Sequence, residues 1–571
     1  MVQKFFNMKI VKDLKEILIK SIKALDINIK EEEIKIEHPS DVSFGDYSTN
    51  IAMVLATRLR KSSGGQSPRE LAEKIKSNIL QNDYIEKIEI AGAGFINFYL
   101  ETEYLIKEAE VLNYEIEFKN KLSEYGKDKT MVIDYSAPNI AKPFGIGHLR
   151  STNIGQAIYN IYQILGWKCI GDNHIGDWGT QYGKLVAAVK KWNDKKIEDL
   201  TIEDLEKLYV KFHKEAESDE KLIDEGRDYF AKLENGDKEA REIWQKCINI
   251  SFREFDKVYE LLGVKIDYIH GESFYEDMLP QITKEIINKK ITKKSEGALI
   301  VELGDMPPAM LQKSNGTTTY FTRDMATIKY RLDNWKPDLI IYEVGVDQEL
   351  HFRQVFKTAE LMGWMPKLGM VHIAHGLIRW TTGKFSTRKG DTIHLSDVID
   401  KAMEKAKEIA PDNNQEQIKA VAIGAVKFND LSSDPRRDVI FDWDKIMSLE
   451  GDSGPYLQYT YARCLSVLNK TQIKEQKNVD EIQKDVNPDE MALIKEFYRF
   501  EEKIIESSTR YSPAVIAEYL LSLARKYNEF YAKNRIIGEK QENFRVFLTH
   551  TTASVLKTGL KLLGIETVEK M

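Results

Sequence analysis

The sequence predicts an α/β protein whose centre is a doubly wound parallel sheet, with an α+β domain before it and an all-helical domain after it. Short runs rich in apolar residues at Met131–Ile133, Lys168–Ile170, Leu339–Tyr342 and Val371–His375 indicate buried strands. Helical stripes separate these runs, as in sheets wound by crossover helices. With 571 residues the chain is too long for one core, because a domain typically holds roughly 100–200 residues.

Composition and charge narrow the class of protein. Hydrophobic residues make up 42% and charged residues 30% of the chain, and the net charge is −7. This balance argues against a generally basic nucleic-acid coat, so any RNA contact is expected to come from local patches. Cys169, Cys247 and Cys464 are too few and too far apart for a disulfide framework or a zinc site. With no apolar run long enough for a bilayer and no signal-peptide core, we expect a cytoplasmic protein with no membrane partner and no structural zinc.

Residues 1–115 are expected to form the small α+β domain. Leu14, Leu18 and Ile22 recur at helical spacing, which indicates one apolar helix face. Residues 85–100 have the pattern of two strands joined by a turn that contains two glycines. The domain therefore combines helices with a small sheet.

Residues 116–395 are expected to hold the parallel sheet, interrupted by charge-rich helical insertions within residues 184–318. In the second half of the sheet we expect a helix from Met325 to Trp335, with Thr322 as its N-cap. Residues 396–571 are expected to be helical throughout.

The stretch from Asp134 to Leu165 is the part of the sequence that indicates most about function. An apolar strand leads into a turn with Gly145 and Gly147, and a helical stripe from Ile154 to Leu165 follows. A helix N-terminus offers unpaired N–H groups, and glycines let a phosphate approach the backbone. An ordinary βα turn with glycines for packing is the alternative, because short glycine patterns also occur by chance.

Gly145-Ile146-Gly147-His148 resembles the "HIGH" signature of class I aminoacyl-tRNA synthetases, with Gly145 in place of the first histidine. The longer string Ser136–Thr152 resembles the arginyl-tRNA synthetase family, as do Gly171–Gln181 and Gly94–Phe98. The resemblance implies a Rossmann-like catalytic domain with insertions. It also implies an N-terminal domain that grips the tRNA elbow and a C-terminal helical domain that binds the anticodon.

An arginine substrate carries a planar guanidinium with five donors, so its recognition needs carboxylate and amide oxygens in the plane of that group. The residues that match the family's arginine pocket are Asp134, Asn139, Tyr320, Asp324 and Gln348. The resemblance implies that Asp134 and Asp324 supply the carboxylates and that Tyr320 packs the aliphatic stem. Gln348 would accept from the guanidinium or help fix the ligand, and Asn139 would bind the α-amino and carboxylate end. Without the resemblance, Asp324 at a helix start would be interpreted as a capping residue.

The segment Thr381–Asp391 carries three cations beside glycines, which suits a pyrophosphate whose charge grows as it leaves. A basic surface turn is the alternative. The segment resembles the family's degenerate "KMSKS" loop, with Thr387 in place of the second signature lysine, and the resemblance assigns the compensation to Lys142. The catalytic residues that it implies are Lys142, His148, Lys384, Arg388 and Lys389. The residues that it implies for ATP are Gly145, Gly147, His148, Gly345 and Ser386.

The resemblance also implies the reaction and the partners. ATP with Mg²⁺ would activate L-arginine to arginyl-adenylate once tRNA is bound, and the 2′-hydroxyl of the terminal adenosine of tRNA(Arg) would then take the arginyl group. Tyr456 and Tyr459 are core residues by default, but aromatic residues beside an arginine can also stack on unpaired anticodon bases. The residues implied to contact tRNA are Phe44, Tyr456, Gln458 and Arg463. We expect a monomer.

Two other functions are consistent with parts of the pattern. A class I synthetase for another amino acid would share the glycine turn, although an apolar substrate would not favour Asp134 and Asp324 beside it. A non-catalytic tRNA-binding relative is suggested by Gly145 and Thr387, which replace two signature residues.

Overall fold

The computed structural model describes residues 9–571 except residues 40, 64–65, 81, 381–393 and 474–485. Its contacts divide the chain into two compact units. The first unit combines residues 1–121 with residues 463–505 and 522–556, and the second holds residues 122–462, 506–521 and 557–571. The helices near the C-terminus therefore contribute residues to both units.

The first unit contains a three-stranded antiparallel sheet in the order β1-β3-β2. Strands β2 (Ile85–Ala91) and β3 (Phe95–Leu100) confirm the predicted pair, and Gly92 and Gly94 in the turn have φ values of 52° and 125°. The other elements with residues in this unit are α1 (Lys9–Lys23), η2 (Glu31–Glu33), η3 (Val42–Phe44), β1 (Tyr47–Thr49), α2 (Ile51–Ser63), α3 (Pro68–Ser77), α4 (Thr102–Glu110), η4 (Val111–Asn113), α5 (Glu115–Ser123), α17 (Gly454–Leu468), α18 (Pro488–Tyr498), α19 (Phe500–Arg510), α20 (Ala514–Lys533) and α21 (Glu542–Leu562).

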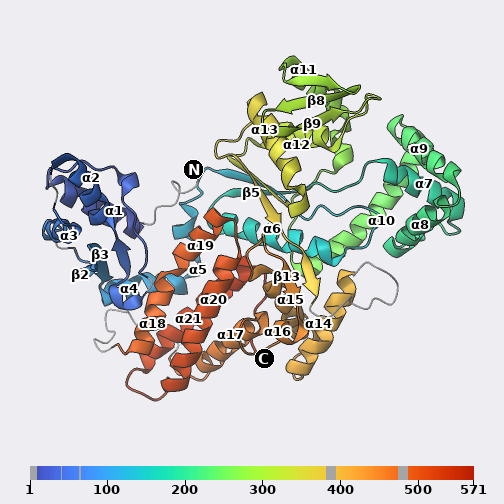
Figure 1. Ribbon diagram of the computed structural model, residues 1–571. Coiled ribbons are helices and arrows are strands. Elements are labelled where there is room, and N and C mark those ends of the chain that lie inside the picture. The colour runs from blue at the N-terminus through green and yellow to red at the C-terminus, as the bar shows by residue number, and fades with distance from the viewer. Residues whose placement is uncertain (1–8, 40, 64–65, 81, 381–393, 474–485) are drawn as a thin grey trace. The chain divides into compact units, whose positions relative to one another are not determined.

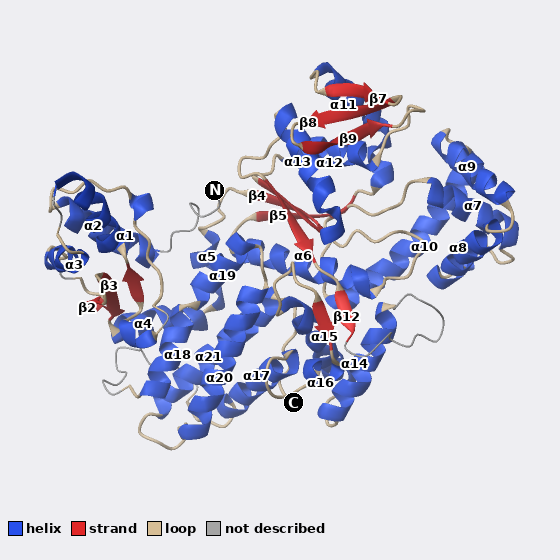
Figure 2. Ribbon diagram, in the orientation of Figure 1, coloured by secondary structure: helices blue, strands red, loops and turns tan. Residues whose placement is uncertain are grey.

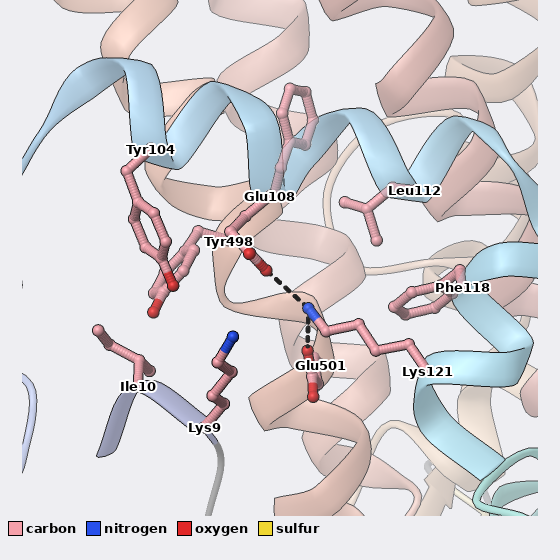
Figure 3. Close-up of a pocket in the computed structure, with 10 residues that line it drawn as sticks. Lys9, Ile10, Tyr104, Glu108, Leu112, Phe118, Lys121, Tyr498 and Glu501 are labelled. Atoms are coloured by element: carbon pink, nitrogen blue, oxygen red, sulfur yellow. Dashed lines mark hydrogen bonds and ion pairs between the residues drawn. The ribbon is translucent and has the colours of Figure 1, made fainter. Parts of the chain in front are cut away.

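A pocket in the first unit lies among helices α4, α5, α18 and α19, and Tyr104 and Tyr498 line it (Figure 3). The Lys121 ammonium reaches Glu108 and Glu501 at 2.6 and 2.8 Å. Burial by itself would lower the pKa of Lys121, but the two carboxylates outweigh burial and raise it. Lys121 therefore stays charged and ties α5 to both α4 and α19.

The second unit is built on a five-stranded parallel sheet in the order β11-β10-β4-β5-β6 (Figure 2). The predicted doubly wound arrangement is confirmed. The chain runs from β4 to β5 and β6 on one side of β4, and β10 and β11 lie on the other side. Such a sheet binds ligands where the strand order reverses, at the carboxyl ends of the strands. The strands are β4 (Thr130–Asp134), β5 (Lys168–Asn173), β6 (Tyr268–Ile269), β10 (Leu339–Gly345) and β11 (Met370–His375).

Helices and two small sheets complete the second unit. Helices α7, α8 and α9 gather in one group, and an antiparallel sheet in the order β7-β8-β9 lies with α11 (Figure 1). The elements are α6 (Ile146–Ile164), α7 (Thr180–Trp192), η5 (Ile197–Asp199), α8 (Ile202–Ala216), α9 (Glu220–Glu234), α10 (Lys238–Leu262), η6 (Glu272–Met278), α11 (Leu279–Asn288), β7 (Thr292–Ser295), β8 (Ala298–Leu303), β9 (Met306–Gln312), α12 (Tyr320–Trp335), η7 (Val346–Gln348), α13 (Glu349–Met362), β12 (Ile378–Trp380), α14 (Leu395–Ile409), α15 (Gln415–Leu431), β13 (Val439–Phe441) and α16 (Trp443–Ile446).

Helix α6 begins directly after the predicted glycine turn and packs closely on the end of β4. A Cβ atom on Gly155 would lie 2.4 Å from the side chain of Tyr135, so only glycine fits at this approach. Gly166 follows the helix with φ +84°, the conformation in which many helices end. The N-terminus of α6 is therefore fixed against the carboxyl end of β4.

Two local predictions are wrong. Helix α12 begins at Tyr320, five residues before Met325, and Thr319 rather than Thr322 precedes it. Thr322 is buried in the first turn, where its hydroxyl donates to the Leu311 carbonyl at 2.6 Å. The chain after residue 396 is also not wholly helical, because β13 pairs in parallel with β12.

Candidate active site

The turn after β4 holds three non-glycine residues in the left-handed region, Ser136, Ala137 and Ala141, with φ values of 75°, 40° and 61°. Such conformations cost roughly 1–3 kcal/mol each and persist where the surroundings impose them. The atoms that accept hydrogen bonds from their backbone N–H groups are, in that order, Ser151 Oγ (2.9 Å), Asn173 Oδ1 (2.9 Å) and Ser251 Oγ (2.8 Å). Side chains of α6, β5 and α10 therefore fix the shape of this turn.

The N-terminus of α6 lies at the glycine turn, here called the cradle, which the sequence predicts to bind phosphate. Gly145 is the residue before the helix, Gly147 is exposed in its first turn, and a Cβ on Gly147 would meet no atom within 4 Å. His148 accepts a hydrogen bond at Nδ1 from the Gly145 N–H at 3.3 Å, so its neutral ring carries the proton on Nε2. Burial and, secondly, the Lys142 ammonium lower the pKa of His148. At neutral pH the ring is therefore a neutral donor.

The glycine-rich string after β5 lies against the same turn. The Ile140 N–H donates to the Gly176 carbonyl at 3.1 Å, and the Gly176 N–H donates to the Pro138 carbonyl at 3.2 Å. Asn139 is exposed, and its Oδ1 lies over Gly176, where a Cβ would meet it at 2.1 Å. The residues that line a small pocket beside this contact are Asn139, Ile140, Ala141, Lys142, Gln181, Tyr182, Leu185 and Tyr209.

Asp134 already contacts a guanidinium, and that guanidinium belongs to the chain itself. Arg331 Nη2 lies 2.7 Å from Asp134 Oδ2 and 2.8 Å from Asp172 Oδ2, and its side chain is 0% exposed. Burial raises the pKa of Asp134, although Arg331 opposes this rise. Asp172 also contacts His270 at 3.0 Å. The structure therefore uses Asp134 in a buried ion-pair network beneath the site, and its predicted contact with the substrate stays a prediction.

Asp324 lies in the second turn of α12 with one oxygen available. Its Oδ2 is 2.5 Å from His351 Nε2, and its Oδ1 has no hydrogen-bond partner within the described residues. Tyr342 is buried against Arg331. Burial is the main cause that raises the pKa of Tyr342, and the charges of Asp134 and Asp324 raise it further. The two carboxylates predicted to lie together therefore share one neighbour at the carboxyl half of the sheet.

Tyr320 and Gln348 are both exposed. Tyr320 lies on α12, the helix that carries Asp324, and Gln348 lies on η7, which follows β10. Tyr320 opens α12 and is 58% exposed, with Arg323 over its ring at 5.8 Å. Gln348 donates to Asp347 Oδ2 at 3.0 Å. Gly345 ends β10, where a Cβ would lie 2.6 Å from Asp347 Oδ1. Both side chains are thus accessible to a ligand.

Glu272 is a candidate residue that sequence reasoning missed. Its Oε2 is buried and has no hydrogen-bond partner in the part of the chain that the structure describes. Burial raises the pKa of Glu272 to about 8, against the Arg323 guanidinium, and the charges of Asp177 and Asp324 raise it further. Glu272 also raises the pKa of Tyr320. A buried, unpartnered carboxylate beside Asp324 and Tyr320 is what a guanidinium pocket requires. The only sequence signal that could have indicated Glu272 as a site residue is its position just after strand β6.

Four predicted residues lie outside the described residues, namely Lys384, Ser386, Arg388 and Lys389. Their predicted contacts with ATP and pyrophosphate stay predictions. The segment is flanked by β12 on one side and by His394 on the other, and His394 pairs with Gly145 of the cradle.

The residues predicted to contact tRNA differ in their exposure. Phe44 is 51% exposed at the end of η3. Tyr456 is half-buried in α17, and Gln458 is fully buried, where its amide donates to the carbonyls of Ala420 and Glu566 at 3.0 and 2.7 Å. Arg463 contacts Asn528 and lies over the Tyr531 ring at 5.2 Å. In this structure Gln458 therefore packs helices together and presents no surface to RNA.

The described residues contain no group of three or more His, Cys, Asp or Glu side chains that could hold a metal ion. No helix among them combines the length and the hydropathy that crossing a bilayer requires.

A parallel sheet with a glycine turn and a helix N-terminus at its switch point, a neutral histidine in that turn and the carboxylates of Asp324 and Glu272 fit a class I aminoacyl-tRNA synthetase. Three family models match the chain in order: "Arginyl tRNA synthetase N terminal domain" at residues 12–100, "tRNA synthetases class I (R), catalytic domain" at residues 111–443, and "DALR anticodon binding domain" at residues 457–571. The chain belongs to the arginyl-tRNA synthetase family.

Individual relatives agree over the whole chain. An arginine–tRNA ligase of Halothermothrix orenii is 42% identical over 575 residues, which cover 98% of this chain and 100% of that protein. An arginine–tRNA ligase of Clostridium kluyveri is 40% identical over 580 residues, with coverage of 98% and 100%. The crystal structure of an arginyl-tRNA synthetase from Plasmodium falciparum superposes with a TM-score of 0.84 at 26% identity, covering 98% of this chain and 99% of that one.

Proposed function

We propose that the protein is an arginine–tRNA ligase that activates L-arginine with ATP and transfers it to the 2′-hydroxyl of the terminal adenosine of tRNA(Arg). The observation that carries this proposal is a pair of carboxylates, Asp324 and Glu272, whose charges act on each other. Asp324 has a free oxygen, and Glu272 has a buried oxygen without a partner among the described residues. A cationic, multi-donor side chain such as guanidinium satisfies both carboxylates, whereas an apolar side chain would leave them uncompensated.

In the first step, a carboxylate oxygen of arginine attacks the α-phosphorus of ATP, a bond to that phosphorus forms, and the bond to the leaving pyrophosphate breaks. The protein's part is positioning and charge stabilisation. The N–H groups at the start of α6 and the Nε2–H of His148 would donate to phosphate oxygens, and the Lys142 ammonium would balance their growing charge. Lys384, Arg388 and Lys389 would stabilise the departing pyrophosphate, and Gly345 and Ser386 would contact the nucleotide. ATP would enter as its Mg²⁺ complex.

The pocket assigns complementary roles to the substrate-binding residues. Asp324 and Glu272 would accept from the guanidinium, and Tyr320 would cover the aliphatic stem. Asn139, at the small pocket beside the cradle, would hold the α-amino and carboxylate end near the α-phosphate, and Gln348 would close the exposed side. Asp134 would supply the second carboxylate for arginine, as the sequence predicts, while its Oδ2 remains paired with Arg331.

The other domains supply the tRNA. We propose the division into residues 1–115, 116–395 and 396–571. The order of the three family matches supports three domains, whereas the catalytic match extends to residue 443 and the anticodon match begins at residue 457. Phe44 would contact the tRNA elbow, and Tyr456 and Arg463 the anticodon stem-loop. The free thiols of Cys169, Cys247 and Cys464 are consistent with a reducing, cytoplasmic location. Activity as a monomer is part of the proposal.

ATP–pyrophosphate exchange across a panel of amino acids, with tRNA present, tests the proposed function. Arginine alone is expected to support exchange. Exchange with another amino acid and not with arginine would identify a different class I synthetase. A wild-type protein that binds tRNA but supports no exchange or aminoacylation would be a non-catalytic relative, with Gly145 and Thr387 as the motivating departures.

Lys142→Ala is expected to lower the rate of arginyl-adenylate formation by about tenfold or more while tRNA affinity changes little. The physical reason is that the ammonium stabilises charge that develops only in the transition state. Single-turnover adenylate formation and tRNA binding by filter retention measure the two effects. Equal losses in both would remove the assigned role, and Lys184→Ala, on the neighbouring helix α7, serves as the control.

The affinity for arginine is expected to rise with pH up to about 8. Below that pH the Glu272 carboxyl is largely protonated, because burial raises its pKa to about 8. A bound guanidinium favours the charged form, so binding releases a proton, and each pH unit below 8 raises the KM for arginine by up to about tenfold. Glu272→Gln is expected to raise the KM and flatten this dependence. A slope that is unchanged in Glu272→Gln would move the effect to another group.

A further inference from the structure

Lys142 lies between the phosphate cradle and the helical insertion. Its ammonium lowers the pKa of His148 in the cradle, and it also contributes to lowering the pKa of His213 on α8, after burial and Lys184. Among the described residues, the Lys142 ammonium contacts the side chain of Tyr209 on α8, whose ring centroid is 5.4 Å from the Lys142 Nζ. The Lys142 ammonium therefore contacts an aromatic ring of the insertion.

Tyr209 is placed to hold this ammonium. The ring is half-buried and contacts the His213 ring edge-on at a centroid distance of 4.6 Å. It also lines the small pocket that Asn139 and Lys142 share with α7. A flexible lysine side chain loses considerable rotamer freedom when it is held in one place, and a cation over a tyrosine face recovers part of that cost.

We propose that Tyr209 is a positioning residue for the activation step, which holds the Lys142 ammonium beside the cradle through a cation–π contact. The insertion helix α8 thereby contributes to adenylate formation, although it lies far from the cradle in the sequence. This inference rests on the proposed function, because Lys142 acts on the phosphates of ATP only if the protein activates an amino acid. The hydroxyl of Tyr209 has no part in the contact, so the ring face alone is required.

Four variants test the proposal in ATP–pyrophosphate exchange with arginine and tRNA. Tyr209→Leu is expected to lower kcat by about two- to fivefold, the size of an exposed cation–π contact, with the KM for arginine unchanged. Tyr209→Phe keeps the ring face and is expected to retain wild-type kcat. In a Lys142→Met background, Tyr209→Leu is expected to have no further effect, because the contact is already gone. Tyr209→Leu should also raise the pKa of the acid limb of the kcat profile, because the ammonium can then move away from His148.

The controls lie on the same insertion. Val210→Ala alters the next residue of α8, which is 58% exposed. Tyr229→Leu removes another tyrosine ring that makes cation–π contacts, with Lys190 and Lys232 at 5.6 and 4.6 Å from its centroid. Neither is expected to change kcat. Thermal melting shows whether Tyr209→Leu is folded, and Tyr209→Met, closer in volume, replaces it if it is not.

The outcomes separate the inference from the function on which it rests. An active wild type with unchanged kcat in Tyr209→Leu, or equal losses with and without Lys142, would overturn the positioning role. A loss in Tyr209→Phe equal to that in Tyr209→Leu would overturn the cation–π contact. Absence of exchange by the wild type would instead contradict the proposed function itself.

Discussion

Replacing Arg331 by methionine is expected to lower the free energy of unfolding of the sheet-containing unit by about 3–5 kcal/mol. Arg331 is fully buried between Asp134 and Asp172, at 2.7 and 2.8 Å. Methionine fills similar space but leaves two buried carboxylates without a cation. Protonation of Asp134 and Asp172 would remove this charge but would itself lower the free energy of unfolding, because in the unfolded chain both carboxyls are ionised at neutral pH.

Denaturant unfolding followed by a probe in the parallel sheet measures the effect, because a chain of this size need not unfold in one step. Lys329→Met is the matched control. It lies on the same helix and loses a partly exposed pair with Asp333 and a contact with the Trp364 ring at 5.9 Å, so its expected cost is about 1 kcal/mol. Similar losses in the two variants would show that the buried network contributes little to stability.

Asp324→Asn is expected to raise the KM for arginine and to lower kcat/KM by about 10- to 150-fold, which corresponds to the roughly 1.5–3 kcal/mol of a charged hydrogen bond. The amide keeps the shape of the side chain but loses the charge that pairs with the guanidinium. The side-chain NH₂ of the new asparagine is a hydrogen-bond donor, and the guanidinium, which has only donors, cannot accept from it. Steady-state exchange with arginine as the varied substrate measures both constants.

The matched control for this variant is Asp333→Asn, on the solvent side of the same helix, where the side chain is 55% exposed. It is expected to leave the KM for arginine unchanged. An unchanged KM in Asp324→Asn would move the guanidinium to another part of the pocket, and Glu272→Gln would then be the variant that identifies it.

The sheet and its cradle could be predicted because their signals are local. Each strand carries its own apolar run, and the turn from Asp134 to the helix containing His148 is one continuous segment. The start of α12 was misplaced because Thr322 looks like a capping residue in sequence. Its hydroxyl is instead satisfied by Leu311, a partner eleven residues away in β9.

The site was harder to predict where partners are distant in sequence. A guanidinium lies between two aspartates, but it is that of Arg331, and the aspartates are Asp134 and Asp172. The expected contact of Asp134 and Asp324 with the substrate stays a prediction. No local sequence pattern predicts that the Arg331 side chain pairs with residues of β4 and β5. Glu272 was missed for the same reason, since its significance comes from burial and from the absence of a partner among the described residues.

The three left-handed residues after β4 have a further consequence for ligand entry. Their unfavourable backbone geometry is imposed when the domain folds, by the hydroxyls of Ser151 and Ser251 and the amide oxygen of Asn173. The fold itself therefore orders this loop, and little ordering of the loop remains to oppose association of a ligand. Swapping a single supporting hydroxyl, such as that of Ser251, would loosen the rim without altering any atom that meets the nucleotide.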